Sequence, residues 1–336
     1  MMDRRRFVAT VAGAGTVPLA GCGAGIFEVT DDEGQGQAPA QAEQIAAVND
    51  RLRRIFTQLA EYSVVANGDP AIDTGSYSDQ EIAVLRDELE GAQTALEELS
   101  ERSETRTTTG SDGRSSSSVR VVEQGVRLAA ARIEIYDQGR AVALQDEQGR
   151  SAFDTQDFGS IETAAMRVRE VTEEITDAAQ ACAAAANALR SGEASVPSFY
   201  DFEAAQREST AFAGVSGQVE PAVTGVLSVA DALGRAAAAR DLLANEQYAA
   251  ASVTYQEAVD AVAAARRQFK LVGDSLPMFT TTTVRARCGL DDLRAALTAA
   301  REGAKAGQQG EADRANERLA AARDALDTYR STCAER

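Results

Sequence analysis

The sequence contains no histidine among its 336 residues. This absence excludes a histidine-based catalytic triad, an imidazole base and a histidine-liganded metal site. Glycine-rich phosphate loops of the Walker or dinucleotide-binding type are also missing. The acidic stretch DDEGQGQ, residues 31–37, lacks the alternating oxygen ligands of a calcium loop. We therefore expect no catalytic residue, no metal site and no cofactor.

Basic residues are scarce, and Lys270 and Lys305 are the only lysines. The chain has 52 acidic and 34 basic residues and a formal net charge of −18. Without a basic patch to neutralise phosphates, nucleic acid is excluded as a partner. No Asn-x-Ser/Thr acceptor for N-glycosylation occurs. The acidic, lysine-poor, Ala- and Val-rich composition resembles that of halophilic proteins, in which excess charge maintains solubility in molar salt.

The N-terminus combines consecutive arginines with a short apolar run that ends in a cysteine. The run Phe7–Ala20 is shorter than the roughly 20 residues that a membrane-spanning helix needs. The pattern resembles the twin-arginine export signal of lipoproteins of the halophilic archaeal type. The export-signal residues are Arg4, Arg5, Arg6, Leu19, Ala20 and Gly21, the last three forming a lipobox with Cys22. An apolar N-terminal helix with an incidental cysteine is the alternative.

The resemblance implies removal of residues 1–21 as a signal peptide and lipidation of the Cys22 thiol. The protein would then be attached to the membrane through this lipid and lie on the extracytoplasmic face. Residues 22–40 are rich in Gly, Gln and acidic side chains. This composition is typical of a flexible linker.

From about Ala40 onward the sequence has helical periodicity, which predicts an all-α fold of long antiparallel hairpins. Two apolar stripes recur at spacings of three and four residues: Ile45, Val48, Leu52, Ile55, Leu59 and Tyr62, and then Ile82, Leu85, Leu89, Ala92, Leu96 and Leu99. Ser78 and Glu81 form a capping box before the second stripe. The polar stretch Thr105–Ser118 predicts an exposed loop before a third helix from Val119.

The fourth predicted helix, from about Ser160, has coiled-coil periodicity. Its seven-residue repeat consists of Ile161, Val168, Ile175, Cys182 and Leu189. Cys182 therefore lies on the buried stripe, where a small core residue is expected and not a reactive thiol. We predict an N-terminal helical bundle over residues 41–192 and a C-terminal helical domain over residues 198–336.

The C-terminal half predicts helices over Val219–Leu243 and Gln247–Phe269, followed by a last hairpin around Gly307–Gly310. Two sets of residues stand out, one in the second of these helices and one in the last hairpin. They are Tyr248, Ala251, Tyr255, Ala258 and Val259, and Gly303, Gly310, Ala315, Leu319 and Ala322. They resemble degenerate tetratricopeptide hairpins, which implies binding of a peptide or protein. Unrelated packing of alanine-rich helices gives the same pattern.

Two cysteines remain once Cys22 and Cys182 are assigned. Cys288 and Cys333 are nearly equidistant from the turn at Gly307–Gly310. Residues equidistant from the turn of an antiparallel helix pair lie side by side, and an exported protein meets an oxidising compartment. We therefore predict a disulfide between Cys288 and Cys333.

Three function classes fit these observations. The first is a lipid-anchored helical scaffold or protein-binding module at the cell surface, whose partner is another envelope protein. The second is a solute-binding lipoprotein, although the apolar strands of two α/β lobes are missing. The third is a hydrolase that uses carboxylates alone, which would need one strongly perturbed acid inside a cleft. Carboxylate pairs such as Asp291–Asp292 and Glu173–Glu174 are read instead as solvated faces of amphipathic helices.

The lipid anchor is tested by the Cys22→Ser variant. Because a serine hydroxyl cannot form the lipid thioether, we expect this variant to leave the membrane fraction while the wild-type protein stays in it. Fractionation at native salt, with the lipid identified by mass spectrometry of the N-terminal peptide, measures this. Equal membrane retention of both proteins would contradict lipidation at Cys22.

Overall fold

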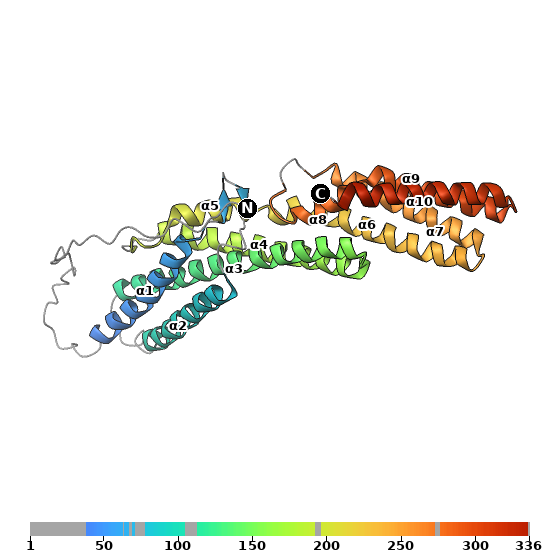
Figure 1. Cartoon of the computed structure of the whole chain (residues 1–336). Helices are drawn as coiled ribbons and strands as arrows, with labels where there is room; N and C mark the ends of the chain where they lie inside the picture. The colour runs from blue at the N-terminus through green and yellow to red at the C-terminus, as the bar shows by residue number, and fades with distance from the viewer. Residues whose placement is uncertain are drawn as a thin grey trace, which may run out of the picture. The chain divides into compact units, whose positions relative to one another are not determined.

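The computed structural model describes residues 38–62, 64–66, 69–70, 78–104, 113–191, 196–272 and 276–334. Gln41–Arg336 form one compact unit. The fold is all-α, as predicted, and its helices pack as hairpins (Figure 1). The helices are α1 (Ala38–Ala60), α2 (Asp79–Glu104), α3 (Gly113–Thr155), α4 (Phe158–Ser191), α5 (Phe202–Phe212), α6 (Val215–Ala244), α7 (Tyr248–Phe269), α8 (Thr280–Arg287), α9 (Leu290–Gln308) and α10 (Ala312–Ala334).

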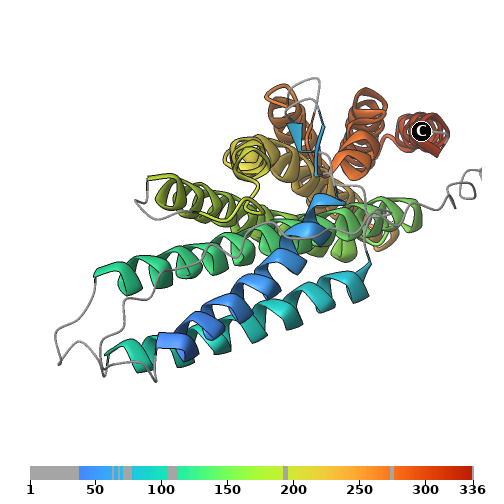
Figure 2. The same ribbon diagram turned by 90° about the vertical axis from the view of Figure 1, so that its left-hand side faces the viewer.

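The N-terminal helices α1, α2 and α3 lie side by side (Figure 2). Arg54 of α1 binds Glu88 of α2 at 2.9 Å, and α2 packs against α3. Both predicted apolar stripes face the core, where Leu52 and Leu85 are fully buried. The capping box is confirmed, since the Glu81 backbone N–H donates to Ser78 Oγ at 3.3 Å and the Ser78 N–H donates to the Glu81 carboxylate.

Two details between these helices differ from the sequence prediction. β1 (Val65–Ala66) and β2 (Asp69–Pro70) form an antiparallel ribbon that pairs Val65 with Pro70. Helix α3 begins at Gly113, so the second part of the predicted loop Thr105–Ser118 is helical. Extending a helix outward from packed residues costs little per residue, which lets this serine-rich segment continue α3.

Helices α3 and α4 form a long hairpin, and the predicted coiled-coil stripe of α4 is buried over its whole length. Cys182 is fully buried in this stripe, as predicted. Its S–H donates to the Ala205 carbonyl at 3.6 Å. Helix α4 also packs against α6, and α3 against α8, so helices from the two predicted halves share packing.

In the C-terminal half, α6 packs against α7, α7 against α9, and α9 against α10. The turns lie close to the predicted positions, with α6 ending at Ala244 and α9 at Gln308. Gly307 allows a close approach of α9 to α7, because a Cβ there would lie 2.6 Å from Tyr248 Cδ1. Close approach of this kind is the packing that small residues permit.

A carboxylate of α3 fixes the start of α8. Asp146 accepts hydrogen bonds from the backbone N–H groups of Thr281 at 2.9 Å and Thr282 at 2.8 Å. The Thr282 hydroxyl donates back to the Asp146 carbonyl at 2.6 Å. Asp146 therefore acts as an N-terminal cap supplied by another helix, and it satisfies donors that have no partner within α8.

The predicted disulfide is present: Cys288, directly after α8, is bonded to Cys333 near the end of α10, with a Cα–Cα distance of 5.6 Å. Gly289 has a positive φ of 60°. A Cβ at Gly289 would lie 2.7 Å from the Tyr329 ring and 3.0 Å from Cys333 Sγ. The bond thus closes the open end of the α9–α10 hairpin around a glycine whose replacement by a larger residue would be strained.

Within the described residues, one segment, Phe202–Ala244, is long and apolar enough to cross a membrane by length and composition. It comprises α5 and α6, between which Ala213 and Gly214 lie. The apolar residues Val219, Val223 and Val226 are fully buried in the core. This is the pattern of a core helix of a folded unit.

Loss of the disulfide should destabilise the folded unit. Because the bond restricts the unfolded chain, we expect Cys333→Ser to lower the free energy of unfolding by about 3–4 kcal/mol. Urea unfolding measures this, with Cys182→Ala as a control that keeps the disulfide. Mass spectrometry of the denatured protein should show two further alkylated cysteines after reduction; an unchanged mass would contradict the bond.

Candidate functional site

The predicted export and lipidation residues lie outside the described part of the chain. They are Arg4, Arg5, Arg6, Leu19, Ala20, Gly21 and Cys22. The predicted linker, residues 22–40, also lies outside it, except that α1 already begins at Ala38.

Cys182 is the free cysteine of the described chain, and its surroundings are unlike those of a reactive thiol. Burial raises its pKa to about 12, with the charge of Glu208 adding to the effect and Arg132 opposing it. A thiol with this pKa is protonated at neutral pH and has little nucleophilic character.

A buried ion pair joins α3 to α5. The Arg132 guanidinium donates two hydrogen bonds to the Glu208 carboxylate, each of 2.7 Å. The Tyr136 hydroxyl donates to the same carboxylate at 3.0 Å. Side-chain exposure is 2% for Arg132 and 6% for Glu208. A bidentate pair of this kind is the strongest form of protein ion pair, and it is placed here in the middle of the core.

The electrostatics of this cluster favour a structural role. Burial lowers the pKa of Arg132, but the hydrogen bonds and charge of Glu208 outweigh it, so that the net shift is upward. Burial, together with the charge of Glu208, raises the pKa of Tyr136. Arg132 is therefore charged and Tyr136 is neutral. Both Glu208 oxygens accept hydrogen bonds from Arg132 or Tyr136, so this carboxylate is held as part of the core and is not a free acid or base.

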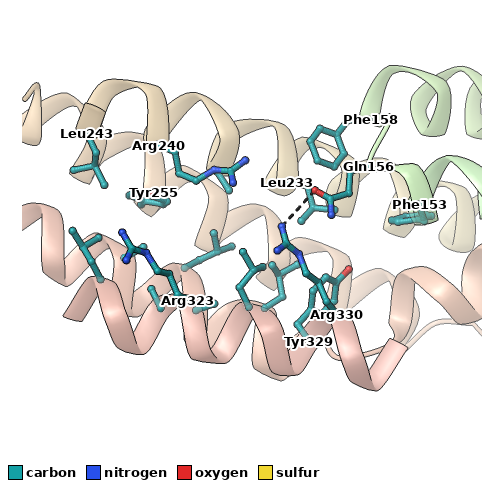
Figure 3. A pocket seen from close by; sticks show the side chains of 18 of the residues that line it. Phe153, Gln156, Phe158, Leu233, Arg240, Leu243, Tyr255, Arg323, Tyr329 and Arg330 are labelled. Carbon is teal, nitrogen blue, oxygen red and sulfur yellow. Dashed lines mark hydrogen bonds between the residues drawn. The ribbon is translucent and has the colours of Figure 1, made fainter. Parts of the chain in front are cut away.

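The second feature is a groove with a volume of about 740 Å³ in the C-terminal half (Figure 3). Helices α6 and α10 form its two walls, and α7 and α9 form its floor. The corner between α3 and α4 closes one end, where Arg330 of α10 donates to Gln156 Oε1 at 3.5 Å. The apolar lining consists of Phe153, Phe158, Leu233, Ala236, Leu243, Ala244, Leu293, Ala296, Leu297, Ala300, Leu319, Ala322 and Leu326.

The groove arises because the four helices pack in sequence order. Helix α10 packs against α9, and α6 against α7, while α7 and α9 join the two pairs. The walls α6 and α10 therefore face each other across open space. Tyr255, Leu319 and Ala322, which the tetratricopeptide resemblance singled out, line this groove. The resemblance did not locate it, since the groove depends on how two hairpins lie together.

The charges at the groove are opposite in sign to the charge of the protein. Four arginines line it, against the single carboxylate of Asp154. They are Arg240, Arg285, Arg323 and Arg330. Arg285 is bound to Asp154 at 3.0 Å. Arg240 and Arg323 make no ion pair with any carboxylate in the part of the chain that is described, and both are exposed.

The two tyrosines of the lining add no negative charge. Burial raises the pKa of Tyr255, with Arg240 opposing the effect, and burial raises the pKa of Tyr329. Both phenols stay neutral at physiological pH, so the groove combines an apolar surface with net positive charge. Sequence reasoning missed the arginines, although Arg323 and Arg330 lie seven residues apart on α10 beside Ala322 and Tyr329.

Among the residues with described positions, no group of three or more Cys, Asp or Glu could hold a metal ion. The groove carries one carboxylate, which is already paired with Arg285. Its chemistry is therefore that of binding an apolar group together with an anion.

The structural role of the buried pair is tested by Glu208→Gln. Because this change leaves Arg132 buried without its counter-charge, we expect the free energy of unfolding to fall by about 3–5 kcal/mol. The double variant Arg132→Met with Glu208→Leu should lose less free energy of unfolding than Glu208→Gln, because it leaves no buried charge without a partner. The exposed pair Arg167–Glu170 supplies the control, since Glu170→Gln should cost under about 0.5 kcal/mol. Equal losses for Glu208→Gln and Glu170→Gln in urea unfolding would contradict this role.

Comparison with known proteins gives no relative for this chain. No family, no curated protein and no solved structure matches it. A function for the protein therefore has to be inferred from the groove, the buried cluster and the N-terminal pattern of its own sequence.

Proposed function

We propose that the protein is a lipid-anchored binding module on the extracytoplasmic face of the cell membrane, and that its groove between α6 and α10 takes up part of another envelope protein. The groove is the observation that carries this proposal. It has a volume of about 740 Å³, a largely apolar lining and arginines on both walls, on a chain of net charge −18. Exposed apolar surfaces of this kind mark interaction sites in soluble folds.

The anchor and the groove support the same function. Lipidation at Cys22 and the linker to residue 40 would hold the helical unit near the membrane, where envelope proteins are concentrated. A tether of this kind raises the local concentration of a membrane-bound partner at the groove, so a weak interaction in the groove can suffice. The tetratricopeptide resemblance, which implies peptide binding, adds to this reading.

A solute-binding lipoprotein is the second candidate function. A volume of about 740 Å³ falls within the range of roughly 300–1,000 Å³ typical of small-molecule sites. The all-α architecture is unlike two lobes that close on a solute, and this favours the first function. The buried carboxylate of Glu208 gives no support to the hydrolase alternative, because it is bound by Arg132 and Tyr136.

The proposed function is tested by photo-crosslinking in cells at native salt. A photoreactive residue is placed at Leu243 of α6 or Leu326 of α10, which line opposite walls of the groove. The control position is Val253 of α7, which is 60% exposed and lies outside the groove. We expect a discrete protein adduct from the groove positions, none from Val253, and loss of the adduct in the Cys22→Ser background.

Two outcomes would contradict the proposal. Equal crosslinking from Val253 and from the groove positions would mean that the groove is not the binding surface. Groove positions that yield no protein adduct would favour the solute-binding alternative, which a thermal-shift screen of small amphiphiles then examines.

A further inference from the structure

We infer that the groove binds an acidic amphipathic α-helix, whose apolar stripe lies between α6 and α10 and whose carboxylates meet the arginines on the two walls. This inference rests on the proposed function and specifies the chemistry of the partner. It follows from three properties of the groove. Helices α6 and α10 leave a gap between them, the lining offers few free backbone groups to a ligand, and arginines lie on both walls.

The order of the helices leaves a place for one more helix. The neighbours α6, α7, α9 and α10 form an incomplete ring, because α6 and α10 are separated by the groove. The lining runs from Leu233 to Ala244 along α6 and from Leu319 to Arg330 along α10. At 1.5 Å per residue each wall is about 16 Å long, which is about three turns of a bound helix.

The backbone chemistry favours a helix over an extended peptide. Most of the lining residues lie inside helices, where the backbone N–H and C=O groups are already bonded within the helix. An extended peptide in an apolar groove would bury backbone groups without partners, which costs free energy for each group. A helix satisfies its own backbone and presents side chains alone, as in known helix-in-groove recognition.

The placement of the arginines selects the charge of the partner. Arg240 extends from α6, and Arg323 and Arg330 extend from the opposite wall (Figure 3). Arg323 and Arg330 are separated by seven residues, or about two helical turns and 10.5 Å. Arg330 is already paired with Asp327 of the same helix at 3.6 Å. Arg240 and Arg323, one on each wall, have no such pair within the described chain and match carboxylates on both flanks of a helix. A single-headed amphiphile would require its cations at one end of the groove.

The inference is tested with two synthetic peptides, fluorescently labelled and about 18 residues long. Both carry leucine at the a and d positions of a heptad; one has glutamate at the flanking e and g positions and the other has lysine. Fluorescence anisotropy, in the salt that keeps the protein folded, measures binding. We expect the glutamate peptide to bind the full-length protein at least tenfold more tightly than the lysine peptide.

The matched variants reverse two charges inside and outside the groove. Arg240→Glu with Arg323→Glu changes both walls, and neither arginine has an ion pair to lose within the described chain. The control, Arg267→Glu with Arg294→Glu, changes the net charge equally at exposed positions of α7 and α9 outside the groove. We expect the groove variant to reverse the preference toward the lysine peptide, and the control to change either affinity less than about threefold.

Several results would overturn the inference. Equal binding of the two peptides would show that charge does not select the partner. An equal effect of both double variants would show that the preference depends on the net charge of the protein and not on the arginines of the groove. Failure of both peptides to bind, while Leu243 still crosslinks to a protein in cells, would reject the helix and leave the proposed function standing. Binding of a fluorescent fatty-acid probe with no binding of peptide would identify a small amphiphile instead.

Discussion

A chain of contacts that begins at Asp146 holds the wall α10 in place. Asp146 of α3 caps α8 through the backbone of Thr281 and Thr282, and α8 leads directly to Cys288. The disulfide links Cys288 covalently to Cys333, near the end of α10. Because Cys333 lies near the C-terminal end of α10, these contacts hold that end of the helix close to α8 and α3. The groove therefore depends on a fixed wall and not on a helix that is free to close over the apolar lining.

The other wall is held by ordinary core packing. Helix α6 lies between α4 and α7, and Val219, Val223 and Val226 are fully buried there. One wall is thus part of the core, whereas the other is secured by a disulfide and a cap. A groove between two such walls can remain open, because the disulfide holds one end of α10 and the packing of α10 on α9 holds the rest. Preorganisation of this kind lowers the cost of binding, since little ordering is left to be done.

Features repeated along one helix, or symmetric about one turn, were predictable from the sequence. The buried stripe of α4, the capping box at Ser78 and the disulfide of Cys288 with Cys333 are of this type. Contacts between distant helices were not predictable. Arg132 and Glu208 are 76 residues apart, and each looks like a surface charge on an amphipathic helix. The groove was missed for the same reason, because its lining comes from two hairpins and from the corner at Gln156.

The combination of an acidic chain and an arginine-lined groove has a physical consequence in concentrated salt. At about 1 M salt the screening length is about 3 Å, so the diffuse negative surface exerts little force beyond contact distance. Apolar burial is not weakened by such screening, and excluded salts strengthen it. Affinity in the groove would then come from the leucine and alanine lining. Arg240 and Arg323 would act at contact distance, fixing the register and charge of the bound helix. Specificity and affinity are in this way assigned to different side chains of the same groove.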